Sequence, residues 1–167
     1  MSRLDSFIRR LEAQRACLDH ACAQLAERPG PVFELGLGNG RTYDHLRDRL
    51  SDAAERWPIY VFERKVAAHP DCIPDDARLY LGEFHDTLPQ AAADFPGKVV
   101  LVHADMGSGD SAANAELAAF VSQALPPALA PGALVLSDQA LTLDGGSLEP
   151  LPEGVPEGRY HLYRMQA

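Results

Sequence analysis

The segment Glu34-Leu35-Gly36-Leu37-Gly38-Asn39-Gly40 is the part of this sequence best suited to hold a ligand. It follows a short apolar run and precedes a segment with helical periodicity, which is where an open α/β sheet binds nucleoside ligands. Glycine has no Cβ atom, so the backbone can turn sharply there and approach a ligand closely. The free N–H groups at the start of the next helix favour an anionic group, such as the carboxylate of a bound amino acid.

An acidic residue, Glu63, stands where a second ligand contact is expected. It ends the apolar run 59–62 and follows Gly40 by about 20 residues, the spacing of the acid that binds ribose hydroxyls in dinucleotide folds. Alternatively, the glycines only shape a tight strand-to-helix turn and Glu63 is a solvated strand end. The two signals occur together, which favours a ligand site.

Four ordered pieces over about residues 30–140 resemble class I S-adenosylmethionine-dependent methyltransferases. The run Glu34-x-Gly36-x-Gly38-x-Gly40 resembles their first motif, and Glu63 resembles the ribose-binding acid of their second. Gly82-Glu83-Phe84 stands where the family contacts adenine, and Leu129-Ala130-Pro131-Gly132-Ala133 resembles the Pro-Gly turn before its fifth strand. The resemblance implies S-adenosylmethionine as cofactor, S-adenosylhomocysteine as product and methyl transfer as the reaction.

The resemblance also implies roles for individual residues. Glu63 is expected on the ribose, and Asp105, beside Met106, on the floor of the site. Tyr43 either covers the methionine end of the cofactor or packs against the sheet. The residues expected near the adenine are Arg64, Gly82, Glu83 and Phe84, and those expected around the methionine part are Glu34, Gly36, Gly38, Asn39, Gly40 and Thr42.

Two other functions stay open at this point. A nicotinamide-dependent oxidoreductase would share the ribose acid, but its fingerprint is Gly-x-Gly-x-x-Gly, and here Arg41 follows Gly40. A non-catalytic S-adenosylmethionine-binding or regulatory subunit would fit a C-terminal end that departs from the family.

Methyl transfer from a sulfonium is a direct displacement, so positioning and exclusion of water are the main demands on the protein. Asp105 and Asp138 follow two apolar runs whose carboxyl ends are expected to be neighbours. His103 is the best general base by position, although a hydrogen-bonded core histidine is the more usual role for such a residue. The candidate catalytic residues are therefore Asp105, His103 and Asp138.

Asp105, Asp138 and Gln139 also look similar to the magnesium ligands of catechol-type O-methyltransferases. Gln139 stands where that family has Asn, however, and the basic and aromatic residues that flank those ligands are missing. We expect Asp138 to cap a loop, and we predict no metal site.

The elements that must position these residues follow from hydrophobic periodicity. Short apolar runs at 31–35, 59–62, 78–81, 99–102 and 133–136 alternate with helical patterns, which indicates a parallel sheet covered on both faces. A helix from about Ser2 to Glu27, with a capping box at Ser2 and Asp5, comes first. Further helices are expected after Gly40, at 86–93 and at 111–125.

The predicted fold is a three-layer, Rossmann-like, doubly wound α/β sheet, mostly parallel, with an N-terminal capping helix. One domain spans 1–167, comprising the helix (1–28), the cofactor-binding core (30–140) and a loop with a last, antiparallel edge strand (141–167). That single strand, 159–165, stands where the family has a helix and a strand pair. The acceptor site is then either open or completed by a second copy of the chain.

Composition limits the partners and the compartment. The chain has 15 basic and 24 acidic residues, a net charge of −9 that repels phosphate backbones and disfavours nucleic acid. The motif that marks methylation of nucleic-acid amino groups or protein glutamine is absent at 105–108, so a small-molecule acceptor is expected, with O-methylation as a candidate reaction. Three cysteines without ligand spacing, no signal peptide and no apolar run of about 18 residues indicate a cytoplasmic protein without membrane attachment.

Overall fold

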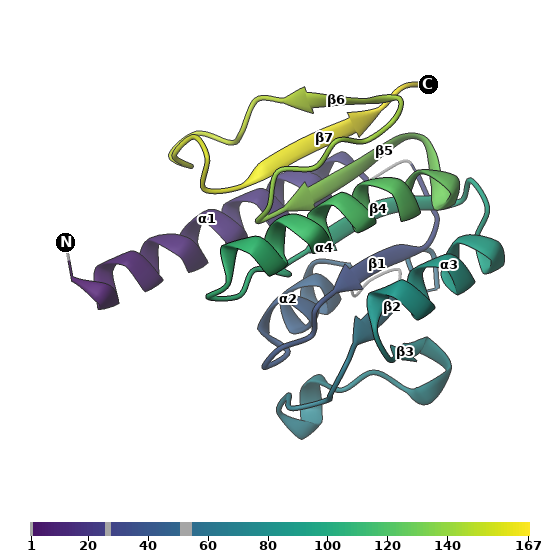
Figure 1. Cartoon of the computed structure of the whole chain (residues 1–167), viewed down its shortest axis with the longest axis horizontal. Helices are drawn as coiled ribbons and strands as arrows, with labels where there is room; N and C mark the ends of the chain where they lie inside the picture. Colours follow the sequence, from purple (N-terminus) through teal and green to yellow (C-terminus); the bar gives the residue numbers. More distant parts are fainter. Residues whose placement is uncertain (1, 26–27, 51–54) are drawn as a thin grey trace.

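A computed structural model describes residues 2–25, 28–50 and 55–167. One sheet of seven strands has the order β3-β2-β1-β4-β5-β7-β6, and β1 to β5 pair in parallel (Figure 1). The strands are β1 (Val32–Leu35), β2 (Ile59–Glu63), β3 (Leu79–Leu81), β4 (Val99–Ala104), β5 (Leu129–Ser137), β6 (Gly146–Glu149) and β7 (His161–Met165). The long helices are α1 (Arg3–Gln24), α2 (Arg41–Arg49), α3 (Phe84–Asp94) and α4 (Ser111–Ala124).

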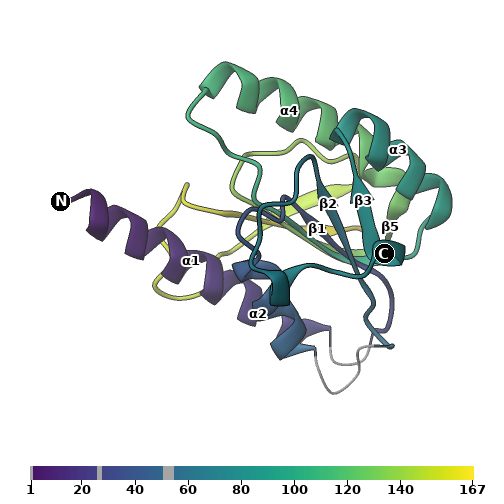
Figure 2. The same ribbon diagram turned by 90° about the horizontal axis from the view of Figure 1, so that it is seen from below.

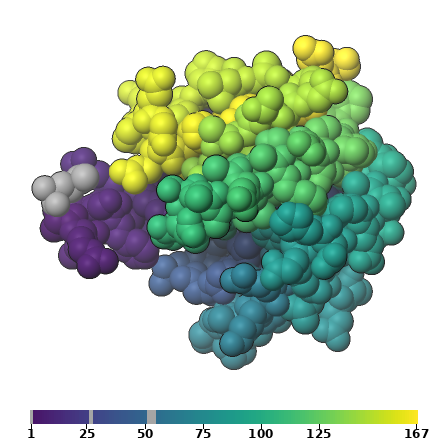
Figure 3. Space-filling model, in the orientation of Figure 1, coloured from purple at the N-terminus to yellow at the C-terminus, as the bar shows by residue number. Residues whose placement is uncertain are grey.

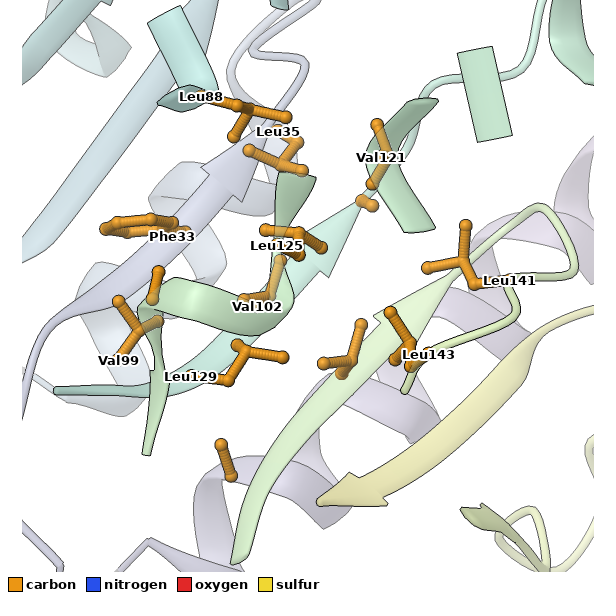
Figure 4. Close-up of a cluster of buried hydrophobic side chains, with 14 of the residues drawn as sticks. Phe33, Leu35, Leu88, Val99, Val102, Val121, Leu125, Leu129, Leu141 and Leu143 are labelled. Carbon is orange, nitrogen blue, oxygen red and sulfur yellow. The ribbon is translucent and has the colours of Figure 1, made fainter. Parts of the chain in front are cut away.

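Helices cover both faces of the sheet: α1 and α2 lie below it and α3 and α4 above it (Figure 2). The three-layer, Rossmann-like prediction is therefore confirmed. The parallel strands are apolar on both faces: all six residues of β4 are buried, because both faces pack against helices. Figure 4 shows the core between the sheet and the α3–α4 layer, where Phe33, Val102 and Leu125 meet.

Helix α1 begins as predicted. The Ser2 hydroxyl accepts a hydrogen bond from the Asp5 N–H, and the Asp5 carboxylate accepts one from the Ser2 N–H, both at 3.0 Å. The predicted end at Glu27 lies outside the described residues. The apolar face is only partly buried, since Leu4, Phe7 and Ile8 are exposed and burial begins at Ala13. Figures 2 and 3 show this N-terminal part of α1 standing out from the body.

The C-terminal end differs from the prediction of one edge strand. The segment 142–158, predicted as a loop, contains β6, and β7 lies between β5 and β6 and is antiparallel to both. The expected absence of a strand pair is thus wrong. The four residues of β6, Gly-Ser-Leu-Glu, carry no alternating pattern, and Leu148 is exposed, so the local sequence holds no strand signal.

Two smaller differences concern element limits. The Pro131-Gly132 step lies inside β5 and not in a turn before it. The strand is irregular at this step: Gly132 has φ +71°, and the pairing register between β4 and β5 shifts there. A bulge explains how this strand accommodates the pair. Helix α3 begins at Phe84, two residues earlier than predicted, and carries Pro89 inside it. None of the described helices is long and apolar enough to cross a membrane.

Candidate functional site

The glycine loop lies at the carboxyl edge of the sheet, between β1 and α2. Gly36, Gly38 and Gly40 have φ of +92°, +52° and +86°, a region that side chains disfavour. A Cβ atom on Gly36 would lie 2.5 Å from the Asp105 carbonyl oxygen, and one on Gly40 would clash with Cys72. A Cβ on Gly38 would meet nothing within 4 Å, so this glycine faces open space.

That open space is a pocket of about 280 Å³ between the glycine loop and α1. Helix α1 thus forms one wall of the pocket. The pocket is lined by Phe7, Arg10, Leu11, Gln14, Gly36, Leu37, Gly38, Asn39, Arg41, Thr42, Asp105 and Gly107.

The Glu63 side chain reaches the glycine loop, and its ribose role stays a prediction. Its Oε2 accepts a hydrogen bond from the Gly38 N–H at 3.0 Å. Its Oε1 accepts from the N–H groups of Arg64 at 2.8 Å and Lys65 at 3.1 Å. A carboxylate has about four acceptor positions, so three backbone bonds leave about one for a ligand hydroxyl. A second ligand hydroxyl would have to displace a backbone donor.

The residues expected near adenine lie at the ends of β2 and β3. The Gly82 N–H donates to the Glu63 carbonyl at 3.0 Å, and the Arg64 guanidinium lies 3.8 Å from the Glu83 carboxylate. Phe84 begins α3 and packs against the core of that layer. Among the described residues, these four are not part of the pocket lining, and their adenine role stays a prediction.

Among the described residues, Tyr43 and Met106 are not part of the pocket lining, and Tyr43 takes the second of its two expected positions, packed against the core. Tyr43 is buried among the residues of the α1–α2 layer, and burial raises the pKa of its hydroxyl. Met106 packs against the core of the α3–α4 layer, although its N–H lies at the site. Asn39 and Thr42 do line the pocket.

A buried group of polar side chains lies directly beneath the glycine loop. Glu34 and His103 are fully buried, and the His103 Nδ1 lies 2.7 Å from a Glu34 carboxylate oxygen. The other Glu34 oxygen accepts from the Thr42 hydroxyl. The His103 Nε2 lies 2.7 Å from the Tyr160 hydroxyl. Since both ring nitrogens have partners, His103 could contact an acceptor only after losing one of these bonds.

The same group continues to the wall of the pocket through α1. The Gln14 amide donates to the Tyr160 hydroxyl at 3.1 Å and to the Asp105 carboxylate at 2.9 Å. The Arg10 guanidinium donates to the other Asp105 oxygen at 2.7 Å. We call this set the polar network; its members are Thr42, Glu34, His103, Tyr160, Gln14, Asp105 and Arg10.

Burial and charge set the protonation of the network. Burial by itself lowers the pKa of His103, but the neighbouring charge of Glu34 and its hydrogen bond outweigh burial, and the pKa is raised. Burial raises the pKa of Tyr160 well above its usual value, so this hydroxyl stays protonated.

Asp138 lies at the end of β5, beside the end of β4, as predicted, but its oxygens already have partners. They accept from the N–H groups of Met106 at 3.0 Å and Gly107 at 2.8 Å, and from the Gln139 amide at 3.0 Å. This is the loop-capping role that we expected over a metal site. Across residues 2–25, 28–50 and 55–167, no group of three or more His, Cys, Asp or Glu side chains could hold a metal ion.

Sequence reasoning did not identify Arg10, Gln14 and Tyr160 as site residues. Gln14 carries a weak signal, because it is a polar residue on the otherwise apolar face of α1 and is only 4% exposed. Tyr160 stands 146 positions from Gln14, at the start of the predicted strand 159–165, and no local pattern could have paired two residues so far apart.

Comparisons with known proteins agree with this geometry. A family model described as S-adenosyl-L-methionine methyltransferase matches residues 1–165. The crystal structure of an S-adenosyl-L-methionine methyl transferase from Silicibacter pomeroyi DSS-3 is 47% identical, with a TM-score of 0.90 and 98% of each chain covered. No match was found among curated proteins.

Two less similar structures share the fold. CalS11, a TDP-rhamnose 3'-O-methyltransferase of calicheamicin biosynthesis, is 20% identical with a TM-score of 0.64, over 92% of this chain and 79% of its own. The O-methyltransferase NovP is 14% identical with a TM-score of 0.58, over 96% of this chain and 81% of its own. The family match spans nearly the whole sequence, and the chain therefore belongs to the S-adenosyl-L-methionine methyltransferase family.

Proposed function

We propose that this protein binds S-adenosylmethionine at the glycine loop and transfers its methyl group to a small-molecule acceptor. The observation that carries the proposal is the contact between Glu63 and Gly38, which joins the expected ribose acid to a glycine that lines the pocket and has open space at its Cβ position. The family match supports the cofactor class.

The residues present fit such a ligand. Gly36 and Gly38 bring backbone close to the pocket without side chains, and Arg41 supplies positive charge at its wall for a carboxylate, whereas the charge of Arg10 is already paired with Asp105. Among the described residues, Asp105 is the acidic residue that lines the pocket, and its carboxylate suits the amino group of the ligand's methionine part. Glu63 offers its remaining acceptor position to a ribose hydroxyl.

S-adenosylmethionine supplies a methyl group on a positively charged sulfur, so the protein's main task is to align the acceptor and keep water out. The α1 wall, with Phe7 and Leu11, provides the apolar part of that enclosure. Asp105 is better placed than His103 to contact a ligand, because it lines the pocket and His103 is fully buried. We propose a hydroxyl as the first acceptor class to test, since CalS11 and NovP are O-methyltransferases.

Calorimetric titration with S-adenosylmethionine, S-adenosylhomocysteine and NAD tests the cofactor. We expect binding of the first two and none of NAD; binding of NAD alone would contradict the proposal. A second experiment incubates the protein with S-adenosylmethionine and pools of phenols, acids, amines and thiols and follows a mass gain of one methyl group. If the cofactor binds but no pool is methylated, the non-catalytic alternative is favoured.

A further inference from the structure

The polar network joins helix α1 to the buried Glu34–His103 pair through a single hydroxyl group. We propose that Tyr160 and Gln14 are positioning residues that hold the α1 wall of the pocket in place for ligand binding. This inference rests on the proposed S-adenosylmethionine site. Neither residue is proposed to react; both act through Asp105, Arg10 and the wall that α1 forms.

The geometry of Gln14 is the first argument. Its amide nitrogen carries two hydrogens, and the Tyr160 hydroxyl and the Asp105 carboxylate accept one each. The donor capacity of this side chain is therefore filled by the two partners. Gln14 thus fixes α1 to β4 through Asp105 and to the start of β7 through Tyr160.

The position of Gln14 along α1 is the second argument. Burial of this helix begins at Ala13 and Gln14, and the turns before them stand out from the body (Figure 2). Phe7, Arg10 and Leu11, which line the pocket, all belong to these projecting turns. Two contacts tie these turns to the rest of the site: the Arg10–Asp105 ion pair and the Arg41 guanidinium, which lies over the Phe7 ring.

The wall is therefore supported at its base by Gln14, and Gln14 is supported by Tyr160. Loss of the Tyr160 hydroxyl leaves the Gln14 amide and the His103 ring each short of a partner, although the ring of residue 160 still fills its place in the core. The consequence expected is a looser α1 wall and weaker ligand binding, without collapse of the fold.

The experiment compares Tyr160→Phe with a matched control, Tyr163→Phe. Tyr163 is also buried, and its hydroxyl also accepts one hydrogen bond, from the Leu141 N–H at 2.8 Å, but it lies on the opposite face of the sheet. Both variants lose one buried hydroxyl, so both should lower the melting temperature. Only Tyr160→Phe should weaken S-adenosylmethionine binding, by roughly fivefold to tenfold, as one lost hydrogen bond implies. Amide hydrogen exchange of residues 3–12 should also rise only in Tyr160→Phe.

A second variant, Gln14→Met, tests the same proposal if Tyr160→Phe does not fold. Gln14→Met keeps the length of the side chain and removes both of its hydrogen bonds, and it should weaken binding to a similar degree. Because Tyr160 and Gln14 act through the same bond, the double variant should bind only slightly more weakly than either single variant. Fully additive losses would contradict the proposal.

Binding of S-adenosylmethionine by the wild type distinguishes a failure of the proposed function from a failure of the positioning role. If the wild-type protein does not bind S-adenosylmethionine, the proposed function fails and the positioning role fails with it. If the wild type binds and Tyr160→Phe binds equally well, only the positioning role is overturned. Equal weakening by Tyr160→Phe and Tyr163→Phe overturns it as well, because the effect would then follow from general destabilisation.

Discussion

Replacing Glu63 by alanine is expected to weaken S-adenosylmethionine binding by about 10- to 150-fold. The estimate comes from the value of hydrogen bonds to charged groups, about 1.5 to 3 kcal/mol, at about 1.4 kcal/mol for each tenfold change in affinity. Two losses contribute. The ribose loses the carboxylate proposed to bind it, and the Gly38 N–H loses its acceptor, so the loop that forms the pocket is less well held.

Isothermal titration calorimetry of the wild type, Glu63→Ala and the control Glu116→Ala measures this effect. Glu116 is an exposed residue of α4, on the opposite face of the sheet from α1, so its removal should leave affinity unchanged. Melting temperatures of all three proteins separate binding from folding. If Glu63→Ala is folded and binds as tightly as the wild type, the ribose role of Glu63 is wrong.

Three further predictions follow from the site. Gly38→Ala is compared with the control Gly97→Ala, because both glycines have a similar positive φ and open space at the Cβ position. Each variant should lose about 1–2 kcal/mol of stability. Only Gly38→Ala should weaken cofactor binding in calorimetry. Because the folded-state pKa of His103 is raised, its stabilisation is complete below about pH 6.5 and is lost as pH rises through that folded pKa. The melting-temperature deficit of His103→Asn should therefore shrink toward alkaline pH, and a constant deficit from pH 6 to 9 would contradict the raised pKa. Asp138→Ala should lower the melting temperature by about 3–12 °C through its lost charged hydrogen bonds, with no change on adding EDTA or magnesium, whereas magnesium-dependent binding in the wild type would restore the metal alternative.

The sequence was sufficient to predict the elements that form the core of the site. The glycine loop, its place between a strand and a helix, and its pairing with Glu63 all follow from local patterns and from the rule that parallel strands share one carboxyl edge. The neighbouring positions of Asp105 and Asp138 follow from the same rule, since the residues before them, Ala104 and Ser137, are paired in the sheet. The capping box at Ser2 is local as well, and it was correctly predicted.

Side-chain direction was not predictable in the same way. Glu34 precedes the glycines as the family pattern requires, but its partners, Thr42 and His103, depend on how β1, β4 and α2 pack. Met106 follows Asp105 in the sequence and packs against the opposite layer, which is the alternation expected of successive residues in an extended chain. The prediction placed both residues at the site because it followed the family motif and did not apply this alternation.

Three features could be read from the sequence: the class of fold, the glycine loop and its acidic partner. Each rests on contacts between near neighbours or on general sheet topology. Three others emerge only when the elements pack together: the strand pair at the C-terminal end, the burial of His103 away from the pocket, and the bond between Gln14 and Tyr160. These features join segments as many as 146 residues apart. Such pairings are set by the packing of whole elements, which local periodicity does not encode.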